Sequence, residues 1–144
     1  MGEPAFTKVT ISHLPFLKPP LPMEGGRVAT PAGELAQIIN GEILRHIVYL
    51  EFLPASQPRG RHYHQHKTEI LYILTGTLQA LFQDITSKEQ LEVTLQAGDM
   101  VRVSPQCAHQ YRSGTYAQAL ELAAQPYDPT DTIAYAMTLR KDEL

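Results

Sequence analysis

The chain has 144 residues, of which 12 are Lys or Arg and 15 are Asp or Glu, giving a formal net charge of −3. This length suits one domain with a substantial core, and the slightly acidic balance offers no basic patch for nucleic acid. No apolar run approaches the roughly 20 residues of a membrane-spanning helix. Residues 1–18 lack the pattern of a signal peptide, and the single cysteine, Cys107, excludes an internal disulfide. We therefore expect a soluble, cytoplasmic protein with neither a nucleic-acid partner nor a membrane partner.

The first 36 residues are expected to form an irregular N-terminal arm. Four prolines and two adjacent glycines fall between residues 15 and 26, and proline fixes φ and removes a backbone donor. A short extended piece is possible over residues 8–12. We expect the arm to lie over the rest of the protein or over a partner subunit, with residues 37–144 forming the domain itself.

From residue 37 onward, short segments rich in β-branched and aromatic residues predict strands, because glycine and proline separate them at intervals of about 8–12 residues. The predicted strands cover residues 37–40, 44–53, 70–74, 78–83, 91–95, 100–103, 109–112 and 119–123. This spacing favours an all-β sandwich or barrel, and the lack of sustained 3.6-residue periodicity disfavours a helical bundle. Residues 130–140 are expected to form a short terminal helix.

The most informative segment is Arg-Gly-Arg-His-Tyr-His-Gln-His-Lys-Thr-Glu, residues 59 to 69. His62 and His64 alternate, so in a strand both side chains point to one face. Glu69 follows a short polar turn, and a hairpin there would return its carboxylate to the same face. His109 is the candidate for a fourth ligand. Imidazole and carboxylate suit Zn, Fe, Mn, Ni or Co, although alternating histidines alone fit an exposed strand face equally well.

The segment His62-x-His64-x4-Glu69-x6-Gly76 resembles the first motif of the cupin superfamily in spacing and residue type. The second motif of that family is a Gly, five residues, a Pro, four residues and a His. Here Gly98 and the final histidine keep their places. The turn between them departs from the pattern, because Ser104 stands at the proline position and Gln106 stands where glycine is common. The resemblance covers about residues 44–124.

The resemblance implies a double-stranded β-helix, the conical jelly-roll barrel of cupins, with one divalent metal ion inside its wider mouth. It assigns the four ligand positions of the family to His62, His64, Glu69 and His109. Many cupins pair through their N-terminal strands, so the proline-rich arm suits a homodimer. A shorter resemblance links residues 59–69 and 125–132 to cupins of nucleotide-sugar and surface-polysaccharide pathways.

Three further side chains are candidates for the pocket. Tyr111 follows His109 by two and should share its inward face, either binding substrate or filling the core. Gln79 follows Gly76 and is a second substrate-binding candidate. His66 lies two residues after His64 and so could share its face, but it falls in the turn. A place on the surface or lining the mouth is therefore favoured over a role as ligand or base.

Three functions fit such a site. The first is a metal-dependent enzyme acting on a small oxygenated metabolite, such as a sugar, a nucleotide-sugar or a keto acid, in an isomerase- or epimerase-like reaction. An iron-dependent dioxygenase and a non-catalytic cupin that binds a small molecule are the alternatives. Because the ligand set alone fixes neither the metal nor the substrate, all three stay open at this point.

Overall fold

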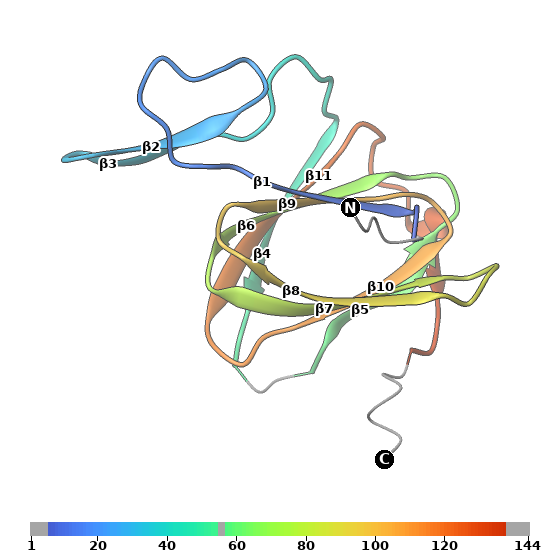
Figure 1. Ribbon diagram of the computed structural model, residues 1–144. Helices are drawn as coiled ribbons and strands as arrows, with labels where there is room; N and C mark the ends of the chain where they lie inside the picture. The colour runs from blue at the N-terminus through green and yellow to red at the C-terminus, as the bar shows by residue number, and fades with distance from the viewer. Residues whose placement is uncertain (1–5, 55–56, 138–144) are drawn as a thin grey trace.

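A computed structural model describes residues 6–54 and 57–137 and shows two antiparallel sheets facing each other in a barrel (Figure 1). The first sheet has the order β1-β9-β6-β11-β4, formed by Val9–His13, Asp99–Val103, Glu69–Thr75, Ala117–Ala123 and His46–Phe52. The second has the order β12-β5-β10-β7-β8, formed by Thr132–Ala134, Arg59–His64, Cys107–Arg112, Thr77–Asp84 and Gln90–Gln96. The expected all-β jelly-roll barrel is confirmed.

Alternation along the strands fills the barrel interior with apolar side chains. In β7, Leu78, Ala80 and Phe82 point inward and are at most 1% exposed. In β6, Leu71 and Ile73 join the same interior cluster. Gly76 carries the chain from β6 in the first sheet to β7 in the second with φ +84°, and a Cβ there would lie 2.4 Å from the backbone oxygen of Tyr116, so only glycine fits. The glycine of the first motif therefore has a steric role.

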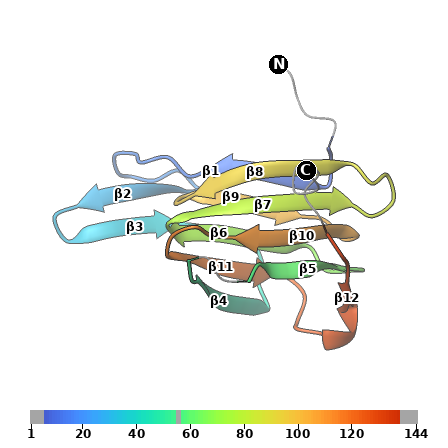
Figure 2. The ribbon, with the colours of Figure 1, turned by 90° about the horizontal axis from the view of Figure 1, so that it is seen from below.

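The N-terminal residues are more regular than the sequence led us to expect. The strand β1 pairs with β9 along its whole length, and β2 (Gly26–Thr30) and β3 (Gly33–Gln37) form a hairpin that projects beside the barrel (Figures 1 and 2). The prolines interrupt only the connection between β1 and β2, so they do not prevent either element. Because β3 ends at Gln37, the strand predicted over residues 37–40 begins too late.

The outer face of the first sheet is covered by this N-terminal region. Leu14, which is 4% exposed, packs with Ile70, Tyr72, Met100 and Leu122. Ile38 and Ile39 pack against the same group. The segment expected to lie over the barrel therefore does so within one chain.

The expected terminal helix is wrong for its described part. Pro129–Asp131 form one 3-10 turn, labelled η1, whose cap is the carboxylate of Asp128, and β12 follows directly. Since β12 pairs with β5, these residues complete the second sheet instead of forming a helix. Residues 138–140 of that prediction lie outside the described residues. Within the described residues, no helix is long and apolar enough to cross a membrane.

Candidate metal centre

Three strands bring the four predicted ligands together, two from the second sheet and one from the first. His62 and His64 lie on β5, Glu69 begins β6, and His109 lies on β10, where it pairs directly with His62. One ligand atom from each residue lies within 4.8 Å of the others. The side chains are mostly enclosed, since His64, Glu69 and His109 are 6%, 3% and 1% exposed. The cluster thus occupies the inside of the barrel at one end.

A β-bulge in β5 sets the direction of these histidines. The register between β10 and β5 shifts after His109, and Arg61 is the extra residue, with φ 61°. Next to it, a Cβ on Gly60 would come within 2.7 Å of the carbonyl oxygen of His109. Glycine is therefore required where the strands approach, and the bulge places His62 directly opposite His109.

The hydrogen bonds around the cluster leave one nitrogen without a partner. The Nε2 of His64 lies 2.9 Å from the carboxylate of Glu69. The Nδ1 of His109 lies 3.2 Å from the carbonyl oxygen of Cys107, which can only accept, so the neutral ring donates from Nδ1. That leaves a lone pair on the buried His109 Nε2, which has no hydrogen-bond partner. An unpartnered, buried, basic nitrogen facing a carboxylate is the arrangement of a metal ligand fixed by an outer hydrogen bond.

The protonation of the cluster also favours a cation. Burial alone would raise the pKa of Glu69, but the imidazoles of His109 and His64 and the ammonium of Lys67 outweigh it and lower that pKa to about 2. Burial, together with the neighbouring histidines, lowers the pKa of His62 to about 4. At neutral pH the carboxylate is therefore ionised and His62 is neutral. The nitrogen and oxygen donors fit a first-row divalent ion such as Zn, Fe, Mn, Ni or Co.

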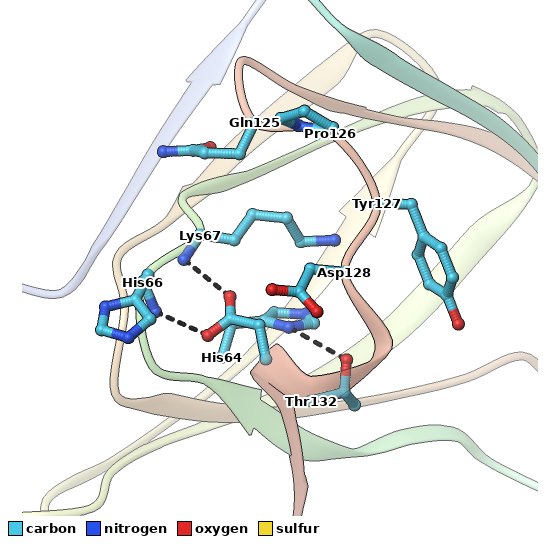
Figure 3. Close-up of a pocket in the computed structure, with 9 residues that line it drawn as sticks. His64, His66, Lys67, Gln125, Pro126, Tyr127, Asp128 and Thr132 are labelled. Atoms are coloured by element: carbon cyan, nitrogen blue, oxygen red, sulfur yellow. Dashed lines mark hydrogen bonds between the residues drawn. The ribbon is translucent and has the colours of Figure 1, made fainter.

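The C-terminal segment holds the turn that connects His64 to Glu69. The carboxylate of Asp131 accepts from the backbone amides of Gln65, His66 and Lys67 at 3.0, 3.0 and 3.1 Å. The neighbouring Thr132 places its hydroxyl 3.4 Å from His64 Nδ1 (Figure 3). Since residues 65–67 connect His64 to Glu69, this contact fixes the spacing of the ligands.

Two adjoining clefts of about 370 and 380 Å³ open beside the cluster. Both are lined by His64, Lys67, Tyr127 and Thr132, and one of them reaches His62. In Figure 3 the side chain of Lys67 extends across the cavity toward Tyr127. A small molecule entering this mouth would therefore meet His62 and His64 first.

The remaining predicted residues take different places. Tyr111 does face inward, 2% exposed, with its ring 5.6 Å from that of His109, and its hydroxyl has no hydrogen-bond partner. The structure does not bring Gln79 to the cluster, because Leu78 and Ala80 take the inward positions and the exposed Gln79 accepts from Thr94. His66 is exposed and lines only one of the clefts.

Four residues around the mouth were given no role from sequence: Lys67, Glu121, Tyr127 and Asp131. Lys67 and Glu121 form an ion pair across 54 positions of sequence, with Nζ and Oε2 3.2 Å apart. No local pattern marks such a contact. The short resemblance over residues 59–69 and 125–132 included Lys67, Tyr127 and Asp131 without assigning their side chains, and it did not reach Glu121.

The sequence matches the Cupin domain family over residues 48–122, about half of the chain, and the fold and the site agree with that match. The protein belongs to the cupin domain family. The expected family resemblance is thereby confirmed.

Similar solved structures are sugar-modifying cupins. The TDP-quinovose 3,4-ketoisomerase WlaRB from Campylobacter jejuni is 17% identical, with a TM-score of 0.71 over 96% of this chain and 97% of that one. A double mutant of the 3,4-ketoisomerase QdtA from Thermoanaerobacterium thermosaccharolyticum, in complex with TDP, is 18% identical, with a TM-score of 0.69 over 89% of this chain and 88% of that one. The dTDP-4-dehydrorhamnose 3,5-epimerase from Bacillus anthracis, with TDP and PPi bound, is 12% identical, with a TM-score of 0.70 over 96% and 85%.

At these identities the likeness establishes the fold. No curated protein matches the sequence. The chain therefore has the architecture of these enzymes, while its chemistry has to be argued from its own residues.

Proposed function

We propose that His62, His64, Glu69 and His109 hold one divalent metal ion, and that the protein is a metal-dependent enzyme with isomerase- or epimerase-like chemistry on a sugar or nucleotide-sugar. The observation that carries the metal proposal is the Nε2 atom of His109, which is buried, has no hydrogen-bond partner and lies 3.7 Å from the carboxylate of Glu69. A closed structural site would not need the clefts that reach His62 and His64. The site is therefore proposed to be catalytic.

The four metal ligands and Tyr111 have different roles in this proposal. A bound divalent ion would act as a Lewis acid toward a carbonyl or hydroxyl oxygen of the substrate. Three neutral imidazoles and one carboxylate leave such a centre with a net charge near +1, which suits a substrate with adjacent oxygens. Tyr111, whose buried hydroxyl has no partner, is the candidate donor toward a substrate oxygen from the interior side. Burial, with the carboxylates of Glu69 and Glu121, raises the pKa of Tyr111 well above 10, so it stays protonated and can donate.

The fold neighbours support the sugar class. Their names describe isomerisation or epimerisation at keto-sugar carbons, and one variant of QdtA was crystallised with TDP-4-keto-6-deoxyglucose. Both reactions move a proton next to a carbonyl group. A centre that polarises a carbonyl oxygen suits that proton transfer.

The test has two parts. Protein purified without a metal-affinity column is analysed for metal, and about one equivalent of a divalent ion per chain is expected. The metal-loaded protein is then incubated in D₂O with TDP-4-keto-6-deoxyglucose and followed by NMR for deuterium incorporation and product. Oxygen consumption is recorded in parallel, because uptake coupled to turnover would replace the isomerase proposal with the dioxygenase alternative. Metal without any turnover would favour the binding protein.

A further inference from the structure

We propose that Lys67, Glu121 and Tyr127 form a subsite at the barrel mouth that binds the pyranose ring of a sugar. The inference rests on the proposed function for the sugar class, and it assigns recognition to residues outside the His/Glu cluster. All three side chains line the cleft of about 370 Å³ that also contains His62 and His64. Clefts of this size hold small metabolites.

The ion pair is unusual for its burial. Lys67 is 8% exposed, and its Nζ lies 3.2 Å from Glu121 and 3.9 Å from Glu69. Desolvating two such charges offsets most of their attraction, so stability alone gives little reason for the pair. Its position gives a better one, because an ammonium and a carboxylate side by side match a vicinal diol. One hydroxyl accepts from Lys67 while its neighbour donates to Glu121.

Tyr127 supplies the complementary apolar surface. It is 65% exposed, although its ring lies only 5.7 Å from that of His46, and both residues line the same cleft. Figure 3 shows the ring at the edge of the cavity with Lys67 pointing toward it. A pyranose has an apolar C–H face and an edge of hydroxyls, so it can stack on Tyr127 while its hydroxyls meet the ion pair.

The charges favour a neutral ring over a keto acid. At the Lys67 side of the cleft, away from the proposed metal, a substrate carboxylate would find no unmatched cation, because the charge of Lys67 is already matched by Glu121. Glu69, 3.9 Å from the same ammonium, adds a second negative charge. A neutral polyol carries no charge that the carboxylates of Glu69 and Glu121 could repel. The geometry also places a bound ring beside His62 and His64, as the proposed chemistry requires.

The subsite is tested with methyl α-D-glucopyranoside, methyl α-D-galactopyranoside and methyl α-L-rhamnopyranoside, and with pyruvate as the keto-acid arm. Saturation-transfer NMR and titration are run on zinc-loaded and on EDTA-treated protein. At least one pyranoside should bind in the millimolar range or tighter, with transfer strongest to the C–H protons of one ring face. Binding of pyruvate but of no pyranoside would overturn the proposal, as would the failure of all four probes.

Variants locate the binding. Tyr127→Ala and Glu121→Gln should each weaken the pyranoside by about tenfold, and Lys67→Met should do the same if melting shows that it folds. Tyr49→Ala removes a tyrosine of similar exposure (52%) from the outside of β4, and Lys8→Met breaks the Lys8–Asp84 pair. Both controls should bind like the wild type. Unchanged binding in Tyr127→Ala and Glu121→Gln would overturn the subsite.

The two proposals fail differently. Pyranoside binding that depends on Tyr127, without turnover of any keto-sugar, supports the subsite and removes the isomerase function. Turnover of a keto-sugar whose rate and KM are unchanged by Tyr127→Ala and Glu121→Gln supports the isomerase and removes the subsite.

Discussion

The two ends of the barrel interior are built from the same strands and have opposite chemistry. In β6, Glu69 faces inward at one end, and Leu71 and Ile73 face inward farther along. In β10, His109 belongs to the polar group, and Tyr111, which also packs in the apolar cluster, lies at the boundary with its ring 5.6 Å from that of His109. Alternation therefore sets which residues face inward, while position along the strand determines which end they serve.

The difference separates stability from function. The apolar end gains free energy from burial, at roughly 25 cal/mol per Å² of apolar surface. The polar end encloses a carboxylate and three imidazoles, and desolvation of such groups costs free energy unless a partner compensates. We infer that the apolar end stabilises the barrel and that the polar end is retained for binding. Substitutions at either end test that division.

The largest effect is expected from His64→Ala, which removes one of the four ligands. Metal content should drop from about one equivalent per chain to nearly none, measured by elemental analysis after dialysis. His66→Ala is the matched control, since His66 is exposed and contributes only its backbone amide to the Asp131 contact. If His66→Ala releases the metal and His64→Ala does not, the assignment of ligands is wrong.

At the apolar end, Leu78→Ala should destabilise the protein by about 2–5 kcal/mol, since truncating a fully buried side chain leaves a cavity. Urea unfolding of the metal-free protein measures this. The folded variant should still bind one metal ion. Loss of metal binding at a temperature where the variant remains folded would show that the two ends are not separable.

Asp131→Asn should weaken metal binding by about tenfold while changing the stability of the metal-free protein little. An amide group in place of the carboxylate cannot accept from all three backbone amides of residues 65–67. The matched control is Asp84→Asn, because the Asp84 carboxylate also accepts from backbone amides, those of Thr86 and Ser87 in the turn that follows β7. Equal losses of affinity in both variants would contradict a specific role for Asp131.

Acid should destabilise the metal-free protein through the polar end. The pKa of His62 falls from 6.5 to about 4 on folding, so the unfolded chain binds more protons and stability declines from pH 6.5 toward 4. The pKa of Glu69, lowered from 4.5 to about 2, extends the decline below pH 4.5. Urea unfolding in EDTA should show a shallower slope between pH 6.5 and 4 for His62→Gln than for the wild type. Identical slopes would contradict the assignment.

The smallest effect on the interior is expected from changes at the N-terminal surface. Ile11, Phe16 and Leu17 are 39%, 53% and 38% exposed, and a second copy of the chain could cover them. Sedimentation should therefore give twice the 16.1 kDa chain mass. Ile11→Ser with Phe16→Ser should produce a monomer with unchanged metal content. A wild-type monomer at micromolar concentration would refute the dimer.

The grouping of the four proposed ligands in space was predictable, because three of them are close in sequence and the fourth follows from the family spacing. His62 and His64 lie two apart on one strand, Glu69 follows after one turn, and His109 completes the family spacing. Seven strands, β4 and β6 to β11, were predictable from local composition, whereas β2, β3 and β12 were not. Gln79 shows the limit of such reasoning, because its alternation with the inward-facing Leu78 and Ala80 puts its side chain outside the barrel.

The residues around the proposed metal ligands were not predictable in the same way. Asp131 and Glu121 reach residues 65–67 from far along the chain, and only the pairing of β12 with β5 and of β11 with β6 brings them there. The hairpin β2–β3 was obscured by the prolines before it, which determine the connection and not the strands. Contacts between residues this far apart leave no periodic pattern in the sequence from which they could be predicted.

The most direct test of the central claim is a crystal structure of the protein with its metal, with data collected on both sides of the absorption edge of the ion found by elemental analysis. We expect one anomalous peak about 2.0–2.2 Å from the ligand atoms of His62, His64, His109 and Glu69, with a coordination position open toward Tyr127 and Lys67. A peak elsewhere, or none in crystals of metal-loaded protein, would show that these four residues do not form the metal site.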